Sequence, residues 1–172
     1  IEITKSYNNI NEWADAIDDA ILHRYFSKVW QPDMKKWKHS GLQLIDEVNN
    51  LRPRNVLDVG CGYNEFKGKI NFLTGIDPYN DKADILIKTI DYTPKQKFDV
   101  ILCLGSINFG SQSKIETEVA HCASLLEKGG TMFFRVNPGV KHDKPESKWI
   151  DFYAWNVPFI IELAEKLNLK VL

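Results

Sequence analysis

The chain has 172 residues and a net charge of −1, and 44% of its residues are hydrophobic. This length and composition are typical of one globular domain with a sizeable core. The balanced charge gives no global basic field to recruit nucleic acid, and no apolar run approaches the ~20 residues that span a bilayer. We therefore expect no membrane partner and disfavour nucleic acid, while the oligomeric state stays open.

The three cysteines, Cys61, Cys103 and Cys122, are odd in number and widely spaced. They form neither a disulfide framework nor the CxxC spacing of a metal site, so we predict no metal. Reduced thiols are typical of a cytoplasmic protein, and nothing at the start resembles a signal peptide. Because residue 1 is Ile, we expect the natural start to lie upstream.

The first fifty residues show helical periodicity. Residues 10–29 predict one helix, and Gln31-Pro32-Asp33 interrupts the pattern before a second helix that runs from Met34 to about Asn50. We expect residues 1–50 to form an N-terminal helical cap on a core of residues 51–172, the whole being a single domain. One face of the first helix carries five apolar residues: Ile10, Trp13, Ile17, Ile21 and Tyr25.

The rest of the chain alternates between predicted strands and helices. This alternation predicts an α/β fold, a Rossmann-like and mostly parallel sheet flanked by helices. About ten residues separate the first two predicted strands, close to the minimum for a right-handed crossover. The next link, PYNDK, cannot hold a full helix, so we expect that part of the sheet to be lightly covered. The predicted strands are 55–59, 71–76, 83–88, 98–104, 130–136 and a sixth starting in 169–172, and the helices are 112–127 and 154–167.

The segment VLDVGCG, residues 56–62, is the most informative part of the sequence. It reads as a buried strand that runs into a glycine turn, with Asp58 inside the apolar run, where a carboxylate is costly unless it is hydrogen-bonded. Asp77 closes the next predicted strand. A glycine turn followed by an acidic residue at the next strand end is how open α/β sheets bind a nucleotide-like cofactor.

These two segments resemble the first motif (LDVGCG, 57–62) and the second-strand acid (GID, 75–77) of class I S-adenosylmethionine-dependent methyltransferases. FDVILCLGSINF (98–109) and LLEKGGTMFFRV (125–136) extend the resemblance, which covers roughly residues 40–172. It implies S-adenosyl-L-methionine as the cofactor and N-terminal helices that cover the site. The family has a seventh strand that this sequence does not reach, so we expect the sequence to be incomplete at its C-terminus.

The resemblance also implies a set of cofactor-binding residues. The glycine turn would lie against the methionine and ribose, Asp77 would accept the ribose hydroxyls, and the residues after the third and fourth predicted strands would meet adenine and the sulfonium. Structural roles stay open for Asp58 as a hydrogen-bonding group, for Asp77 as a turn former and for Asp91 as a loop residue. The full set is Asp58, Gly60, Cys61, Gly62, Asp77, Pro78, Asp91, Tyr92, Leu104, Gly105 and Ser106.

Three positions depart from nucleotide-binding patterns. Lys88 stands where many relatives have an acidic residue after the third strand. Asn64 replaces the usual third glycine. The turn remains feasible because Asn tolerates left-handed backbone angles. Glu65 stands where a nicotinamide-binding fingerprint needs glycine, which disfavours a nicotinamide-dependent enzyme.

Methyl transfer from an activated sulfonium mainly requires alignment, so the sequence need not contain a catalytic triad. The candidate catalytic residues are His142, on a polar loop after the fifth core strand, and Asn108. A solvated loop and a helix cap are the respective structural alternatives. The aromatic segment Trp149–Trp155 could shape an apolar acceptor site, and Trp30 and Trp37 lie near the expected cofactor loop.

We therefore expect a cytoplasmic S-adenosylmethionine-dependent methyltransferase that acts on a small-molecule acceptor. One alternative is a catalytically silent methyltransferase fold that serves as a binding or regulatory module. Another is an RNA or DNA methyltransferase, because Lys35-Lys36-Trp37-Lys38 mixes basic and aromatic residues, although such a run is usually a solvated helix face.

Overall fold

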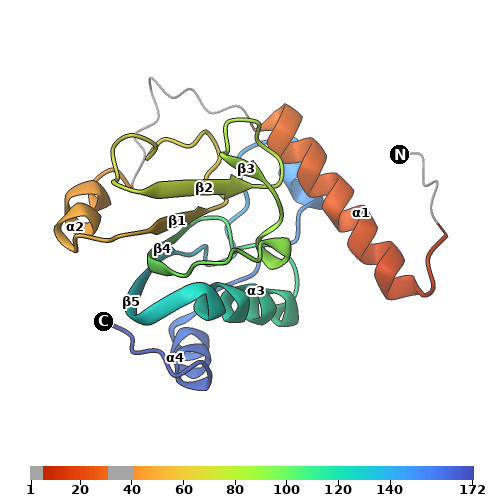
Figure 1. The fold of residues 1–172 in the computed structure, drawn as a ribbon. Coiled ribbons are helices and arrows are strands. Elements are labelled where there is room, and N and C mark those ends of the chain that lie inside the picture. The colour runs from red at the N-terminus through yellow and green to blue at the C-terminus, as the bar shows by residue number, and fades with distance from the viewer. Residues whose placement is uncertain (1–5, 31–40) are drawn as a thin grey trace.

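The computed structural model describes residues 6–30 and 41–172. Five parallel strands form one sheet in the order β3-β2-β1-β4-β5 (Figure 1). The order reverses between β1 and β4, which is where open α/β sheets place a ligand beyond the carboxyl ends of their strands. The strands are β1 (Val56–Val59), β2 (Leu73–Asp77), β3 (Ile85–Leu86), β4 (Phe98–Leu104) and β5 (Leu126–Arg135).

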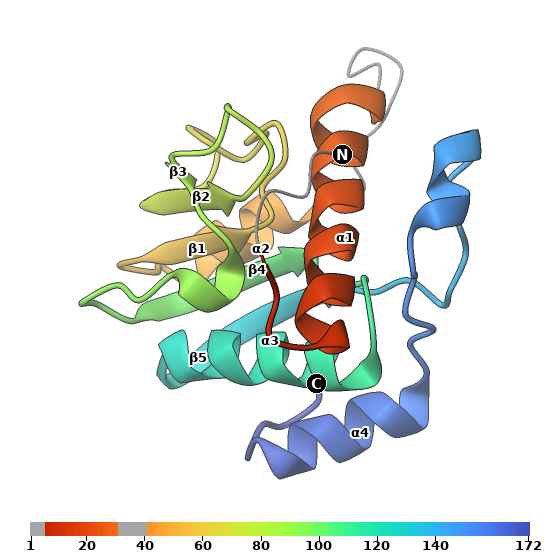
Figure 2. The same ribbon diagram turned by 90° about the vertical axis from the view of Figure 1, so that its right-hand side faces the viewer.

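Helices cover both faces of the sheet, and one helix crosses its carboxyl edge. Figures 1 and 2 show α3 and α4 stacked below the sheet, while α1 stands beside the strand ends. The helices are α1 (Ile10–Arg24), continued by a π-helical turn η1 (Tyr25–Val29), α2 (Leu44–Asn50), α3 (Gln112–Leu125), α4 (Val157–Lys166) and the short 3-10 turns η2 (Thr89–Asp91) and η3 (Pro145–Trp149).

Three of these helices begin at a polar cap. The side chains of Asn9, Ser111 and Asn156 accept backbone N–H groups in the first turns of α1, α3 and α4. Each such cap satisfies a donor that has no partner inside the helix.

The strand residues alternate between two buried clusters. Leu57 and Ile101 pack with α3 and α4 on one face, whereas Val56 and Val100 pack with Val48 of α2 on the other. Because successive strand side chains point to opposite faces, continuous apolar strands fill both clusters, as expected for a parallel sheet.

The first crossover, from β1 to β2, contains no covering helix. Residues 60–72, all of which the structure describes, contain turns and no α-helix. Phe66 and Ile70 from this segment are buried against Leu73 and take the place of a covering helix. The edge strand β3 has only two residues, and Ile85 and Leu86 remain 38% and 61% exposed.

Five predicted strands are confirmed, with changes at two of them. β3 is shorter than predicted, and β5 begins at Leu126 because Leu126 already pairs with Phe98 before an irregularity in the register. The predicted sixth strand at 169–172 is wrong. The N–H of Leu169 donates to the carbonyl of Ala164 and so terminates α4, while Val171 and Leu172 are exposed.

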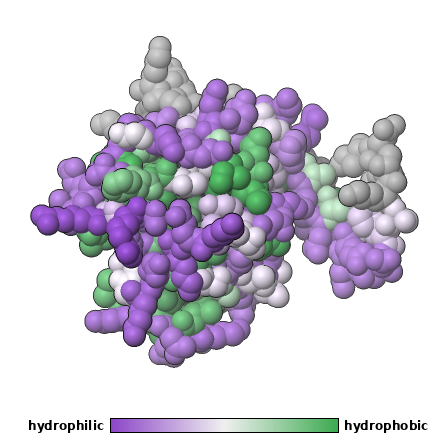
Figure 3. Space-filling view, viewed as in Figure 1, coloured by the Kyte–Doolittle hydropathy of each residue, from purple (hydrophilic) through white to green (hydrophobic). Residues whose placement is uncertain are grey.

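The N-terminal helix is confirmed, but little of it is buried. Leu22 and Tyr25 near its end are buried, whereas Ile10 and Trp13 are exposed, and the projecting end of α1 shows mostly hydrophilic residues in Figure 3. The predicted second helix is seen as α2, and its Met34 and Trp37 lie outside the described residues, as does Lys35–Lys38. Within the described parts of the chain, no helix is long and apolar enough to cross a bilayer.

Candidate functional site

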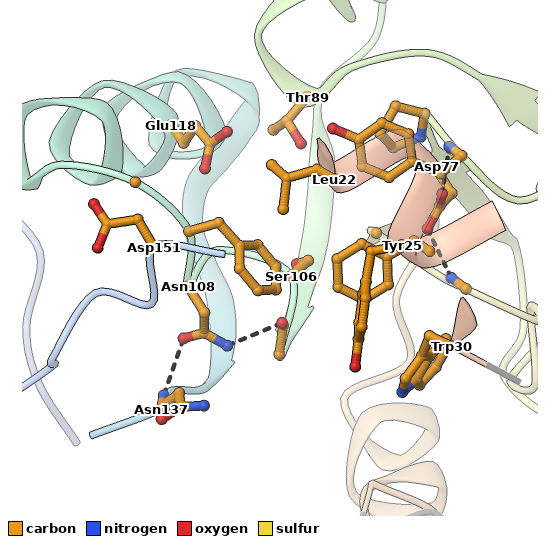
Figure 4. Close-up of a pocket in the computed structure, with 18 of the residues that line it drawn as sticks. Leu22, Tyr25, Trp30, Asp77, Thr89, Ser106, Asn108, Glu118, Asn137 and Asp151 are labelled. Carbon is orange, nitrogen blue, oxygen red and sulfur yellow. Dashed lines mark hydrogen bonds between the residues drawn. The ribbon is translucent and has the colours of Figure 1, made fainter. Parts of the chain in front are cut away.

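A cavity of about 1290 Å³ lies at the carboxyl edge of the sheet. Its floor is formed by the turn after β1, the end of β2 and the loop after β4, and α1 with η1 forms a wall. Figure 4 shows Tyr25 and Trp30 on one side of this space, and Asn108 and Asp151 on the other. The site therefore brings together segments from both halves of the chain.

Two glycines shape the turn after β1 for different reasons. A Cβ on Gly60, which has φ +65°, would stand 2.3 Å from Cβ of Ser106. At Gly62, with φ +54°, a Cβ would meet nothing closer than the Trp30 ring at 3.8 Å. Gly60 is thus required by the neighbouring loop, while Gly62 is required by its backbone angle and leaves space toward the cavity. Asn64 has φ +58°, a left-handed angle that Asn tolerates, so the turn forms without a third glycine.

The carboxylate of Asp77 organises this floor. Its Oδ2 accepts the N–H of Gly62 at 3.0 Å, and its Oδ1 accepts those of Tyr79 and Asn80 at 2.7 and 2.9 Å. Burial raises the pKa of Asp77, and the three N–H donors oppose that rise. Asp77 therefore does form a turn, which runs through Pro78 to Asn80. An ionised carboxylate in this arrangement keeps one lone-pair direction on Oδ2 for a further donor.

Asp58 lies beneath the turn and is only 3% exposed. It is not among the described residues that line the cavity, so direct cofactor contact is not what this geometry offers. Strand alternation turns its side chain toward the α2 face, together with Val56. Burial, and then the charge of Asp77, raise the pKa of Asp58 to about 7.

The segment after β3 differs from the prediction by two residues. Thr89 and Ile90 line the cavity, but Asp91 and Tyr92 do not. The turn η2 starts directly after Lys88 and carries the chain away, so that Tyr92 packs against Phe98 and its carbonyl lies 2.9 Å from Nε2 of His121. Thr89 and Ile90 thus occupy the place in the cavity lining that was predicted for Asp91 and Tyr92.

The loop after β4 lies in the cavity as predicted, with Leu104, Gly105 and Ser106 all in its lining. Arg135, which sequence reasoning missed, supports this loop by donating from Nη2 to the carbonyl of Leu104 at 2.7 Å. Burial lowers the pKa of Arg135. Gly105 has φ +100°, and a Cβ there would stand 3.0 Å from the guanidinium.

Asn108 joins two loops. Its Nδ2 donates to the carbonyl of Gly105 at 2.9 Å, and its Oδ1 accepts the N–H of Asn137 at 2.9 Å (Figure 4). Ser111, not Asn108, caps α3. Asn108 therefore links the loop after β4 to Asn137, and each of its side-chain groups keeps one further hydrogen-bonding position, so its catalytic role stays a prediction.

His142 does reach the cavity, where it meets a residue of the N-terminal helix. Its Nδ1 lies 3.0 Å from Oη of Tyr25, and its ring is half-buried. Burial lowers the pKa of His142, and Asp143 acts in the opposite direction. Among the described residues, its nearest aromatic neighbour is Phe152, with ring centroids 5.1 Å apart. The helical spacing marked Tyr25 as buried, but no sequence signal paired it with His142.

Aromatic side chains from η1 and from Trp30, the residue after it, line one wall. Phe26 stacks on Tyr79 with centroids 6.1 Å apart, and Trp30 stacks on Tyr63 at 5.9 Å. The expected aromatic acceptor site at Trp149–Trp155 is not formed, because only Asp151 of this segment is in the lining. Trp149 is exposed, and Trp155 is buried and donates to the carbonyl of Ile107.

Acidic residues of α1 and α3 face the cavity. Asp15, Asp18 and Asp19 line it from α1, and Asp19 forms an ion pair with Lys88 across it. Glu118 lines it from α3, and its pKa is raised to about 7 by burial, with Asp19 adding to the rise and Lys114 opposing it. Asp15 and Asp18 thus bring carboxylates to this wall, and Lys88 and Lys114 line the cavity beside the other two acids.

No family model matches the chain, and no curated protein matches it. Solved structures do. Over 96% of this chain and 81% of the other, the fold matches a Burkholderia thailandensis 1,6-didemethyltoxoflavin-N1-methyltransferase, crystallised with 1,6-didemethyltoxoflavin and S-adenosylhomocysteine, with a TM-score of 0.64 and 15% identity.

Two further solved methyltransferase structures match the fold of this chain. Magnesium protoporphyrin IX methyltransferase from Synechocystis, with bound S-adenosylmethionine, has a TM-score of 0.63 and 14% identity over 95% of this chain and 88% of the other. The N-methyltransferase NodS from Bradyrhizobium japonicum, with S-adenosylhomocysteine, has a TM-score of 0.61 and 16% identity over 86% and 84%. At these identities the likeness establishes the fold.

Proposed function

Because the chain has the fold of class I S-adenosylmethionine-dependent methyltransferases, we propose that it binds S-adenosylmethionine and methylates a small molecule. The observation that carries this proposal is the contact between Gly62 and Asp77. It fixes the glycine turn to the second strand end on the floor of a cavity at the switch point of the sheet.

The residues present fit this cofactor. Gly62 leaves room for the methionine end, and the remaining lone pair on Oδ2 of Asp77 suits one ribose hydroxyl. Ser106 Oγ is buried with no hydrogen-bond partner among the described residues, so the loop after β4 has an unused polar group beside the turn. Pro78 and Ile90 line the part of the cavity where adenine would lie.

When bound, S-adenosylmethionine supplies an activated methyl sulfonium. The chain's own task is to align an acceptor with that methyl group and to exclude water. The cavity of about 1290 Å³ exceeds the 300–1,000 Å³ of a typical single-ligand pocket, which supports space for a cofactor and a small acceptor together. The acidic lining from α1 argues against an RNA or DNA acceptor at this mouth.

The proposal is tested by calorimetric titration with S-adenosylhomocysteine and by transfer of a radiolabelled methyl group. The acceptor probes are phenethylamine, catechol, benzoate and dithiothreitol, which represent amine, phenol, carboxylate and thiol chemistry. Saturable binding with transfer to at least one class supports the proposal. Binding without transfer to any class favours the silent binding module, and the absence of binding overturns the cofactor assignment.

A further inference from the structure

The hydrogen bond between Tyr25 and His142 joins the N-terminal helix to the loop after β5. The atoms Oη and Nδ1 are 3.0 Å apart, and both residues line the cavity. Tyr25 is 2% exposed and is the first residue of the π-helical turn that continues α1. Such turns are frequent at functional sites, because they redirect side chains that a regular helix would place elsewhere.

The direction of this bond follows from which group holds a hydrogen. Burial raises the pKa of Tyr25, and the charges of Glu146 and Asp143 raise it further, so the phenol keeps its O–H. A buried O–H needs an acceptor, and Nδ1 of His142 is the one that the described residues provide. The phenol hydrogen therefore points to Nδ1.

His142 must then carry its own hydrogen on the other ring nitrogen. Burial lowers its pKa below the ordinary value of 6.5, with Asp143 opposing, so the ring is neutral at pH 7. A neutral imidazole that accepts at Nδ1 has its hydrogen on Nε2.

The ring is held in place on several sides. The ring of Phe152 lies 5.1 Å from it and that of Phe26 6.4 Å from it, centroid to centroid. The hydroxyl of Ser147 donates to the carbonyl of His142 at 2.7 Å, which anchors its backbone to η3. Tyr25 thus completes a rigid setting for a polar side chain at the cavity wall.

We propose that Tyr25 is a positioning residue that holds His142 as the Nε2–H tautomer, so that His142 donates a hydrogen bond to the methyl acceptor rather than removing its proton. This inference rests on the proposed methyl transfer. In that reaction an electron pair of the acceptor forms the new bond to the methyl carbon, sulfur keeps the pair of the broken bond, and any proton on the acceptor atom passes to solvent when the methylated product leaves the cavity. That pair faces the methyl group, so the hydrogen bond from Nε2 of His142 goes to a different lone pair of the acceptor, such as one on the second oxygen of a catechol or a carboxylate.

The tautomer can be measured without any acceptor. Long-range nitrogen–proton spectra of labelled protein at neutral pH resolve the two ring nitrogens of each histidine, and His142→Gln assigns the signal. We expect Nε2 of His142 to carry the hydrogen and Nδ1 to show the shift of a hydrogen-bonded acceptor. Hydrogen on Nδ1 would overturn the inference.

Tyr25→Phe removes only the donor. In this variant the Nδ1 signal of His142 should move to that of a nitrogen without a hydrogen bond. Tyr7→Phe should leave the signal unchanged, since Tyr7 does not line the cavity. An unchanged Nδ1 signal in a folded Tyr25→Phe variant contradicts the positioning role.

Two substitutions of His142 separate donor from base, because glutamine can donate a hydrogen bond but cannot take up a proton. With the acceptor probe that is methylated, His142→Ala should lower kcat/KM about tenfold, and His142→Gln should stay within about threefold of the parent. A loss of about 100-fold or more in both variants would instead identify a base. Absence of S-adenosylhomocysteine binding to the parent overturns the proposed function, whereas the tautomer is decided by the spectra alone.

Discussion

The backbone N–H of Gly62 donates to Oδ2 of Asp77 at 3.0 Å, so the turn after β1 is fastened to the end of β2. The same carboxylate accepts two more N–H groups on Oδ1. One side chain thereby sets the shape of two of the three segments that form the floor of the cavity. Loss of this carboxylate should disturb both the proposed ribose contact and the floor itself.

Asp77→Ala should weaken S-adenosylhomocysteine binding by roughly 1–3 kcal/mol, the range for a charge-assisted hydrogen bond and for leaving buried donors unpaired. Calorimetric titration gives the affinity, and urea unfolding reports how far the turn is destabilised. Asp81→Ala is the matched control, because Asp81 is an exposed acid of the same loop and should leave the affinity unchanged. Equal affinities of folded Asp77→Ala and the parent would remove the ribose assignment.

Most of the sheet could be predicted because its strands are buried on both faces and therefore read as continuous apolar runs, as in FDVILCL. The predicted third strand, 83–88, is longer than β3, because burial on both faces does not fix the length of an exposed edge strand. Residues 169–172 look like a strand, but strand formation needs a partner, and here the backbone of Leu169 completes the end of α4. The local sequence pattern does not reveal whether a segment pairs with a neighbouring strand or with the end of a helix.

The lining of the cavity could be predicted where it depends on backbone shape, and less so where it depends on long-range packing. The glycine turn, Asp77 and the loop at Gly105 follow from local sequence. The pairing of Tyr25 with His142 joins residues 117 positions apart, and no periodicity encodes it. Thr89 and Ile90 were missed because the 3-10 turn after Lys88 shifts the chain by two residues relative to the expected alignment.

The two glycines Gly60 and Gly68 offer a test of close packing at the turn. Both have positive φ, but a Cβ on Gly60 would meet Ser106 at 2.3 Å, while one on Gly68 would meet nothing within 4 Å. Gly68→Ala should lower the free energy of unfolding by about 1–2 kcal/mol, the cost of a left-handed residue alone. Gly60→Ala should lower it further and abolish cofactor binding. Similar unfolding free energies for the two variants would contradict the proposed close approach.

The buried carboxyl of Asp58 should make stability depend on pH. Its pKa is raised from 3.8 to about 7 in the folded protein, so the native state binds more protons than the unfolded state between these values. The free energy of unfolding should therefore fall as pH rises through this window, and above it the loss is complete. Glu118 contributes in the same direction, so the difference between variant and parent isolates Asp58.

Asp58→Asn removes the part of the pH dependence of the free energy of unfolding that comes from the Asp58 carboxyl. Urea unfolding at about pH 5 and about pH 8 should show a smaller decrease for the variant than for the parent. Equal decreases would mean that Asp58 titrates near its ordinary value in the folded chain.

The ion pair between Asp19 and Lys88 should control the mobility of α1 more than the stability of the whole protein. Both side chains are partly exposed, at 37% and 45%, so Lys88→Ala should change the free energy of unfolding by only about 0–1 kcal/mol. The buried residues of α1 and η1, Leu22 and Tyr25, lie near the C-terminal end of the helix. Lys88 contacts the helix at Asp19, which lies nearer its N-terminus. Backbone amides of α1 up to Asp19 should exchange faster with solvent in this variant, and in the parent at high salt, where the pair is screened.

Lys166→Ala is the control, since it breaks a pair with Glu116 outside the cavity and should leave exchange in α1 unchanged. If both variants show the same exchange in α1, the helix is held by its apolar contacts alone, and the ion pair does not close the site.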